Sequence, residues 1–215
     1  MLAVNRLWGV RSEMLLNINR ENPQLRLIKQ AVQVLNDGGI IIYPTDTAYG
    51  LGCDLCNRRG IEKIYEIKRS SKKQPFSIVC ADLSDISNYA VVSNYAYKIM
   101  KRLLPGPYTF VLEASRLVPK ILMPKRKTVG IRVPDNRICL ALVKEFGRPI
   151  ISTTVTTEEG EIMVDPLEMK EQLGRQVDLF ISEGIIATEL SSVVSLVDDV
   201  PEVIRVGGGD VSAFQ

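Results

Sequence analysis

The chain alternates short runs of β-branched and aromatic residues with longer stretches whose apolar residues recur every three or four positions. The first two short runs lie at residues 40–43 and 49–53, and striped stretches flank them at 25–35 and 58–68. Short runs suit buried strands, whereas a stripe of about ten or more residues suits a helix with one apolar face. The alternation predicts a mixed sheet with helices packed against it, which is an α/β fold.

The pattern continues to the end of the chain without a repeat or a linker. We predict further strands at residues 76–80, 108–112, 128–133, 149–152, 177–181, 193–197 and 202–206, and helices at 95–104, 136–146 and 166–173. Asn22-Pro23 predicts the start of the first helix and Gly38-Gly39 predicts its end. A chain of 215 residues is long enough for one sizeable core and short for two, so we assign residues 14–215 to a single domain.

Residues 1–13 carry no periodic apolar stripe, and Arg6 and Arg11 interrupt their apolar part. They do not look like a secretory leader, and we expect a poorly packed N-terminal extension. No apolar run approaches the roughly 20 residues that cross a bilayer. We therefore expect a cytoplasmic protein with no membrane partner and with reduced thiols.

Histidine is absent from the chain. Its absence excludes Ser-His-Asp and Cys-His catalysis, imidazole metal ligands and a histidine acid or base. Cys53 and Cys56 have CxxC spacing, but a zinc site would need a second pair, and Cys80 and Cys139 stand alone. We predict structural thiols, and a chemistry that depends on carboxylates, lysines, arginines, hydroxyls, thiols and backbone dipoles.

Basic residues gather in two stretches of the chain. One contains Lys63, Lys68, Arg69, Lys72 and Lys73, and the other Lys120, Lys125, Arg126, Lys127 and Arg132. The net charge of +2 does not by itself indicate a nucleic-acid partner. Such stretches form solvated faces or converge on one anionic ligand, and the sequence leaves both alternatives open.

The clearest candidate site follows the first predicted strand. Tyr43-Pro44-Thr45-Asp46-Thr47-Ala48-Tyr49-Gly50-Leu51-Gly52 places two hydroxyls beside a carboxylate, and then glycines that allow close approach of the backbone. Lys68-Arg69-Ser70-Ser71-Lys72-Lys73-Gln74-Pro75-Phe76 places cations ahead of another strand. No P-loop or GxGxxG sequence follows a strand, and Gly207-Gly208-Gly209 predicts a flexible tail because no helix follows it.

These motifs resemble those of the YrdC/YciO family, and most closely its YciO branch. Family members carry a strand, then Pro-Thr-[Glu/Asp]-Thr-x-Tyr-Gly-Leu-Gly, then Lys-x-Arg before Pro-Leu. The resemblance continues in the family's order through Pro105-Gly106-Pro107-Tyr108-Thr109-Phe110, Gly130-Ile131-Arg132-Val133-Pro134, Ser152-Thr153, Ser191-Ser192-Val193 and Arg205-Val206-Gly207. It covers residues 22–212.

The resemblance implies a single-domain, twisted, open mixed sheet with flanking helices and a concave basic face. Best-known members are threonylcarbamoyl-AMP synthases, which join L-threonine, bicarbonate or CO₂ and ATP, release pyrophosphate and serve the t6A modification of tRNA. Other members are described as binding double-stranded RNA or tRNA. The implied cofactor is ATP, with Mg²⁺ able to accompany its phosphates and no residue assigned as a metal ligand.

The resemblance also implies site residues. Lys68 and Arg69 would act on the phosphates as catalytic residues, and Ser152, Thr154, Ser192 and Arg205 would complete the ATP site, while Thr45, Thr47, Thr109 and Arg132 would contact the threonine side. Phosphoryl-type transfer depends mostly on positioning and charge neutralisation, so a site of this kind needs no histidine.

Two positions depart from the synthase pattern. Synthases show Ser-Ala-Asn and then Ser-Gly where this chain has Ser152-Thr153-Thr154-Val155-Thr156-Thr157, so an amide that both donates and accepts is lost. Arg69 comes one position early, and on a helix its side chain would point about 100° from the expected direction. Two functions stay open: an L-threonylcarbamoyladenylate synthase-like enzyme with weakened activity or altered substrate, and an RNA-binding module without synthesis.

Overall fold

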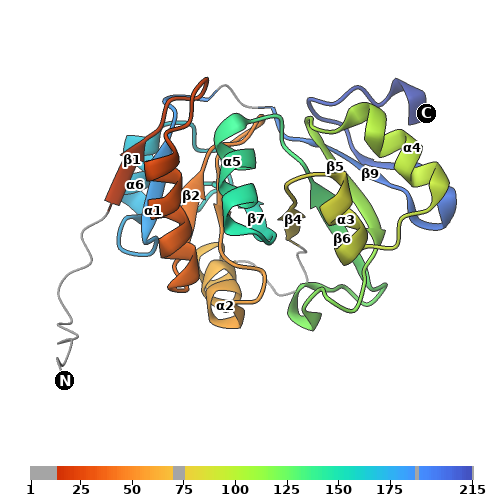
Figure 1. Cartoon of the computed structure of the whole chain (residues 1–215), viewed down its shortest axis with the longest axis horizontal. Helices are drawn as coiled ribbons and strands as arrows, with labels where there is room; N and C mark the ends of the chain where they lie inside the picture. The colour runs from red at the N-terminus through yellow and green to blue at the C-terminus, as the bar shows by residue number, and fades with distance from the viewer. Residues whose placement is uncertain (1–13, 70–75, 187–188, 215) are drawn as a thin grey trace.

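The computed structural model describes residues 14–69, 76–186 and 189–214, so our expectation for residues 1–13 lies outside the described residues. In the described part, ten strands form one mixed sheet in the order β1-β8-β2-β3-β7-β4-β6-β5-β9-β10. Helices flank this sheet along its whole width (Figure 1). The predicted α/β fold with a single mixed sheet is confirmed.

The elements follow one another along the chain as the alternation predicts. The strands are β1 (Met14–Asn17), β2 (Ile41–Tyr43), β3 (Gly50–Gly52), β4 (Ser77–Val79), β5 (Tyr108–Glu113), β6 (Thr128–Arg132), β7 (Ile150–Thr154), β8 (Leu179–Ser182), β9 (Ser192–Ser195) and β10 (Glu202–Arg205). The helices are α1 (Leu25–Asn36), α2 (Arg58–Ile67), α3 (Leu83–Tyr89), α4 (Asn94–Leu103), α5 (Arg137–Phe146) and α6 (Pro166–Leu173), with short 3-10 turns at Lys120–Leu122, Val197–Asp199 and Ser212–Phe214.

The start of α1 differs from the prediction. The helix begins at Leu25, and Gln24 occupies the cap position without a side-chain hydrogen bond. The side chain of Asn19 accepts hydrogen bonds from the backbone N–H groups of Glu21 and Asn22, both at 2.9 Å. Asn22 therefore belongs to a turn that an upstream asparagine stabilises, and it does not cap the helix.

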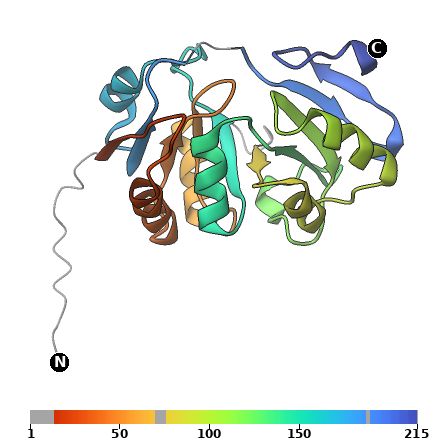
Figure 2. The ribbon, with the colours of Figure 1, turned by 45° about the horizontal axis from the view of Figure 1, so that its top comes forward.

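Two apolar clusters hold the helices on the sheet. Helices α1 and α5 lie side by side (Figure 2) and share one cluster with β2, β8 and the neighbouring strands, built on Ile28, Ile41 and Leu142. Helices α2, α3, α4 and α6 pack on the other cluster, in which Ile61, Met100 and other side chains are fully buried. Burial of this extent fixes the strand register, because a slip of one residue would expose each inward side chain.

Candidate functional site

A cavity of about 410 Å³ opens over the middle of the sheet. Its floor is one face of the central strands, because the register places Ser152, Ser77, Gly130 and Val111 side by side on β7, β4, β6 and β5. Gly130 leaves space at the floor of the cavity, since a Cβ there would lie 3.1 Å from the Thr109 side chain. The volume falls in the range of small-molecule sites, about 300–1,000 Å³.

The lining of this cavity is cationic and rich in hydroxyls. Three cations, Lys68, Arg132 and Arg205, line it, and the described lining residues include no carboxylate. Eight hydroxyl side chains also line it: Ser77, Thr109, Thr128, Ser152, Thr153, Thr154, Thr156 and Ser191. Asp46 pairs with Arg132 from outside this lining, whereas Lys68 and Arg205 have only neutral hydrogen-bond acceptors among the described residues. Such an excess of cations favours an anionic ligand, such as one that carries phosphate or carboxylate groups.

Arg132 is only partly satisfied by the protein. Its Nη2 atom donates to Asp46 Oδ1 and to Thr47 Oγ1, both at 2.9 Å. Its Nε atom is buried and has no hydrogen-bond partner among the described residues. A buried donor without an acceptor costs about 1–3 kcal/mol, so the free N–H is a place where a ligand acceptor would stabilise the site.

Arg205 faces the cavity from β10, at the edge of the sheet. Its Nε and Nη2 atoms donate to the carbonyl oxygen of Ser191 at 3.0 and 2.8 Å, and Nη2 also donates to Ser191 Oγ at 3.0 Å. Burial lowers the pKa of Arg205, and repulsion from the charge of Arg132 lowers it further. The two guanidinium groups therefore lie close enough to repel, and a bound anion would relieve that repulsion.

Lys68 closes the other side of the cavity, directly after the last turn of α2. Its Nζ atom donates to the carbonyl oxygen of Thr154 at 3.0 Å and to Thr156 Oγ1. Burial lowers the pKa of this ammonium group. Both of these hydrogen-bond acceptors are neutral oxygens, so the charge of Lys68 is not neutralised by an ion pair among the described residues. The two basic stretches of the sequence thus converge here through Lys68 and Arg132.

Comparison with known proteins identifies the family of the chain. A profile of the Sua5/YciO/YrdC family, described as "Telomere recombination", matches residues 33–207. The chain belongs to the Sua5/YciO/YrdC family. The Escherichia coli protein named YciO is 43% identical over 199 residues, which cover 92% of this chain and 97% of YciO. The crystal structure of E. coli YciO matches with a TM-score of 0.90 at 42% identity, over 94% of this chain and 99% of that one.

Two further members of the Sua5/YciO/YrdC family connect the chain to synthases. A putative threonylcarbamoyl-AMP synthase of Methanocaldococcus jannaschii is 32% identical over 196 residues, 89% of each chain. P. abyssi Sua5, crystallised with L-threonine, matches with a TM-score of 0.85 at 26% identity, over 91% of this chain and 58% of that one. The predicted resemblance to the YrdC/YciO family is confirmed, with YciO among the most similar relatives.

The structure brings six of the ten predicted site residues to the cavity. Those that line it are Lys68, Thr109, Arg132, Ser152, Thr154 and Arg205, and those that do not are Thr45, Thr47, Arg69 and Ser192. The assigned roles of the six lining residues remain predictions. For the other four, the structure shows what each side chain contacts instead.

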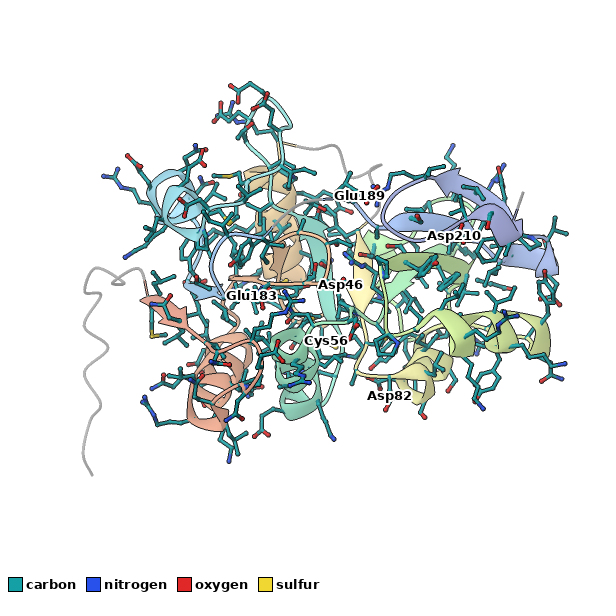
Figure 3. All side chains as sticks on the ribbon, turned by 90° about the horizontal axis from the view of Figure 1, so that it is seen from above. Asp46, Cys56, Asp82, Glu183, Glu189 and Asp210 are labelled. Atoms are coloured by element: carbon teal, nitrogen blue, oxygen red, sulfur yellow. The ribbon has the colours of Figure 1, made fainter. Side chains whose placement is uncertain are left out.

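Thr45 and Thr47 belong to the loop between β2 and β3 and do not line the cavity. Both are buried, and Thr45 Oγ1 donates to the carbonyl oxygen of Ala48 at 2.5 Å. Thr47 Oγ1 accepts from Arg132. Neither hydroxyl lines the cavity, and their predicted contact with a substrate stays a prediction. In the structure Thr45 stabilises the loop and Thr47 contacts Arg132, which does line the cavity. Asp46 of the same loop lies near the middle of the molecule (Figure 3).

Arg69 does not line this cavity; it lines a second cavity of about 460 Å³, which shares Lys68 and Thr156 with the first. It comes directly after Lys68, which caps the end of α2, and has a φ of 45°; its exposed side chain forms an ion pair with Glu158 at 2.5 Å. The chain has already left the helix at Arg69, so the 100° offset that we expected for a helical segment does not apply there. The catalytic roles of Lys68 and Arg69 both stay predictions, and of the two Lys68 lines this cavity.

Ser192 is a structural residue of the C-terminal segment. Its hydroxyl is fully buried, donates to the carbonyl oxygen of Gly209 at 2.6 Å and accepts from the N–H groups of Gly207 and Gly209. The predicted flexible glycine tail is therefore wrong. A Cβ at Gly209 would lie 2.4 Å from the Tyr108 ring, so the glycine permits this close packing. The neighbouring Ser191 lines the cavity instead.

Sequence reasoning missed Ser77, Thr156 and Ser191 as cavity residues. Ser77 and Ser152 are paired across β4 and β7, and alternation along each strand was the only signal that could have placed them on one face. Thr156 lies beyond the end of β7, and its place depends on Lys68. No periodicity in the sequence reports a contact of this kind.

The cysteines do not form a metal site in the described part of the chain. Cys53, Cys80 and Cys139 are buried, Cys56 is exposed, and all four are free thiols. Burial raises the pKa of each of the three buried thiols. Among the described residues no group of three potential ligands could hold a metal ion. Within the same residues, no helix is long and apolar enough to cross a membrane.

Proposed function

We propose that the cavity binds ATP and that the protein forms L-threonylcarbamoyladenylate, the reaction named for its synthase relatives. The observation that carries the proposal is a cavity lined by three cations and, among the described residues, by no carboxylate. The buried Nε of Arg132 also has no hydrogen-bond acceptor among the described residues. Further support comes from the M. jannaschii relative, named a putative threonylcarbamoyl-AMP synthase, and from P. abyssi Sua5, crystallised with L-threonine.

In this proposal the amine of L-threonine attacks the carbon of CO₂, supplied as such or as bicarbonate, and releases one proton to form a carbamate. An oxygen of the carbamate then attacks the α-phosphorus of ATP. The bond from that phosphorus to the bridging oxygen of pyrophosphate breaks, and pyrophosphate leaves with the electron pair. No oxidant is needed and no histidine is required.

Each cation has a task that its position supports. Lys68 and Arg205 lie on opposite sides of the cavity and would neutralise the phosphate charge that grows during the displacement. Arg132 would bind the threonine carboxylate through its free Nε. A bidentate contact is not available to Arg132, because its Nη2 is already held by Asp46 and Thr47.

Mg²⁺ would enter this site with the nucleotide. The described lining residues contain no carboxylate to coordinate it, so phosphate oxygens and water would hold the ion. When bound, it would supply additional charge neutralisation at the phosphates. The protein's own contribution is the arrangement of cations and hydroxyls around them.

The direct test is pyrophosphate release from ATP, bicarbonate and L-threonine, with a panel of other amino acids for comparison. Lys68→Met should weaken ATP binding about 10- to 100-fold, the range of a lost charge-assisted hydrogen bond. Lys63→Met is the matched control, since Lys63 is exposed on the same helix and does not line the cavity. Equal ATP affinity in both variants would contradict the assignment, and pyrophosphate release with another amino acid alone would change the substrate.

RNA binding is a second candidate, favoured by one observation. Lys120, Lys125, Arg126 and Lys127 are all exposed around the turn between β5 and β6, outside the cavity. A phosphate backbone held there would release counterions, so its affinity would fall steeply with salt. Removing charge from Lys125 and Arg126 should weaken RNA binding and leave ATP affinity unchanged, if both functions exist.

A further inference from the structure

The buried Tyr43 of β2 contacts a hydroxyl that lines the cavity. Its Oη atom donates to Ser152 Oγ at 2.7 Å. The Tyr43 side chain is fully buried, and Ser152 is its recorded hydrogen-bond partner among the described residues. If Ser152 donated to Tyr43 instead, the phenol proton would be buried without an acceptor, which costs about 1–3 kcal/mol. The donor is therefore Tyr43.

The surroundings of this contact are shaped to keep it. A Cβ on Gly50 would lie 2.8 Å from the Tyr43 ring and 3.1 Å from Ser152 Oγ, and a Cβ on Gly52 would lie 3.1 Å from the same ring. Two glycines of β3 thus make room for the tyrosine ring on the face of the sheet that carries Ser152. Burial also raises the pKa of Tyr43, so the phenol keeps its proton throughout the physiological range.

Two other cavity hydroxyls receive hydrogen bonds from groups that can only donate. Lys68 Nζ donates to Thr156 Oγ1, and Arg205 Nη2 donates to Ser191 Oγ. A hydroxyl has one proton and two lone pairs, so each of these oxygens accepts and keeps its proton for another partner. Acceptance of a bond from a cation also polarises the O–H group and makes it a better donor.

Ser191 and Thr109 share one hydrogen bond at 2.9 Å, in which either oxygen can be the donor. The pair has two protons and uses one of them in this bond. Whichever way it is oriented, one proton remains for a ligand. Ser77 is different, because its Oγ donates to the carbonyl oxygen of Ser152 at 3.3 Å. Its proton is therefore already used in a hydrogen bond within the protein.

From these contacts we infer that Tyr43 is a positioning residue, which turns the proton of Ser152 into the cavity, and that the hydroxyls of Ser152, Thr156 and the Thr109–Ser191 pair form a set of oriented donors. Such a set selects a ligand that presents only acceptors, as the oxygens of phosphate and carboxylate groups do. The inference rests on the proposed function for the identity of that ligand. It extends the proposed function by assigning a role to Tyr43, a residue that touches no substrate.

Tyr43→Phe tests the inference, because it removes one hydroxyl and leaves the ring that packs against Gly50 and Gly52 of β3. We expect it to weaken the binding of pyrophosphate and of ATP about 5- to 10-fold, as for one hydrogen bond, and to leave adenosine binding unchanged. Tyr49→Phe is the matched control. Tyr49 is equally buried and donates to the carbonyl oxygen of Gly184 at 2.6 Å, away from the cavity.

Ser152→Ala supplies a second route, since it removes the donated proton at the cavity itself. We expect it to lower pyrophosphate affinity as much as Tyr43→Phe does, and the double variant to lose no more than either single variant. A merely structural tyrosine would shift the melting temperature in both tyrosine variants without this non-additivity in affinity. Full additivity, or unchanged affinity in Tyr43→Phe, would overturn the inference while ATP binding by the parent leaves the proposed function standing.

The remaining outcomes separate the two proposals. A parent protein that binds pyrophosphate in a Tyr43-dependent manner but does not bind ATP would support the oriented donors and overturn the proposed ATP site. A parent protein that binds neither ligand would overturn both. If Tyr43→Phe lowers the melting temperature too far for titration, the comparison of Ser152→Ala with the parent decides the matter, and an unchanged affinity there overturns the inference.

Discussion

Arg132 and Asp46 form an ion pair in which the guanidinium Nη2 lies 2.9 Å from the carboxylate, and the two side chains are only 9% and 8% exposed. The second carboxylate oxygen of Asp46 accepts from the backbone N–H of Asp135 at 3.0 Å. The pair therefore joins the loop after β2 to the segment after β6. Through these contacts, a loop that does not itself line the cavity holds the Arg132 guanidinium in place.

Asp46→Asn should destabilise the protein strongly. The substitution preserves shape but leaves the Arg132 charge buried without a counter-charge, and removal of one partner from a buried pair costs about 3–5 kcal/mol. Urea unfolding measures the difference, and excess pyrophosphate should restore part of it by supplying negative charge in the cavity. A loss of less than about 0.5 kcal/mol would show that solvent reaches Arg132.

The neighbouring serines Ser191 and Ser192 should separate structure from binding. Ser192→Ala removes three hydrogen bonds that hold the glycine segment and should lower the free energy of unfolding by about 1–3 kcal/mol, with little change in ATP affinity. Ser191→Ala removes a hydroxyl that lines the cavity and should mainly weaken ATP binding. Melting curves and titrations of both variants check the assignment. The reverse pattern would restore Ser192 to the nucleotide site.

Much of the fold can be predicted from the sequence, because most of its strands are buried and consist of residues with a high propensity for strands. The run at β2 is β-branched and lies between Gly39 and Pro44, so its ends are marked as clearly as its interior. β1 and α3 carried no such signal. β1 is an edge strand without β-branched residues, and α3 is only seven residues long, too short to show a helical period.

The candidate site is harder to predict from the sequence, because its chemistry depends on contacts between segments that are distant along the chain. Family motifs located the cations, yet adjacent residues of those motifs have different tasks, as Lys68 and Arg69 show. Backbone geometry at the end of α2 decides which of the two reaches the cavity. The packing of Gly209 on Tyr108 likewise joins segments about a hundred residues apart, which no local pattern reports.

Thiol labelling should distinguish the exposed cysteine from the buried ones. In the native protein only Cys56 should react with a thiol reagent, because Cys53, Cys80 and Cys139 are buried and burial raises the pKa of each thiol. In denaturant all four should react. Cys56→Ser should abolish the native signal. Rapid labelling of a second thiol in the native state would mean that the segment around it opens locally: the end of β3 for Cys53, the end of β4 for Cys80 or α5 for Cys139.

The buried carboxylate of Glu183 should make stability depend on pH. Its side chain is 3% exposed, its Oε2 accepts from Asn136 Nδ2 at 2.9 Å, and its Oε1 has no hydrogen-bond partner in the described part of the chain. Arg20 Nη1 lies 3.8 Å from Oε1. Burial raises the pKa of Glu183 above its usual 4.5, and Glu21 adds to this, while Asn136 and Arg20 oppose it.

A raised pKa in the folded state means that the folded protein holds this proton at a pH where the unfolded chain has lost it. The stabilising contribution is therefore present below pH 4.5 and is lost as the pH rises through the folded-state pKa. Glu183→Gln carries no charge to bury and should be more stable than the parent near neutral pH, with a difference that vanishes in acid. Urea unfolding across this pH range measures it. A variant that is less stable at every pH would show that the ionised carboxylate, held by Asn136 and Arg20, contributes more than its burial costs.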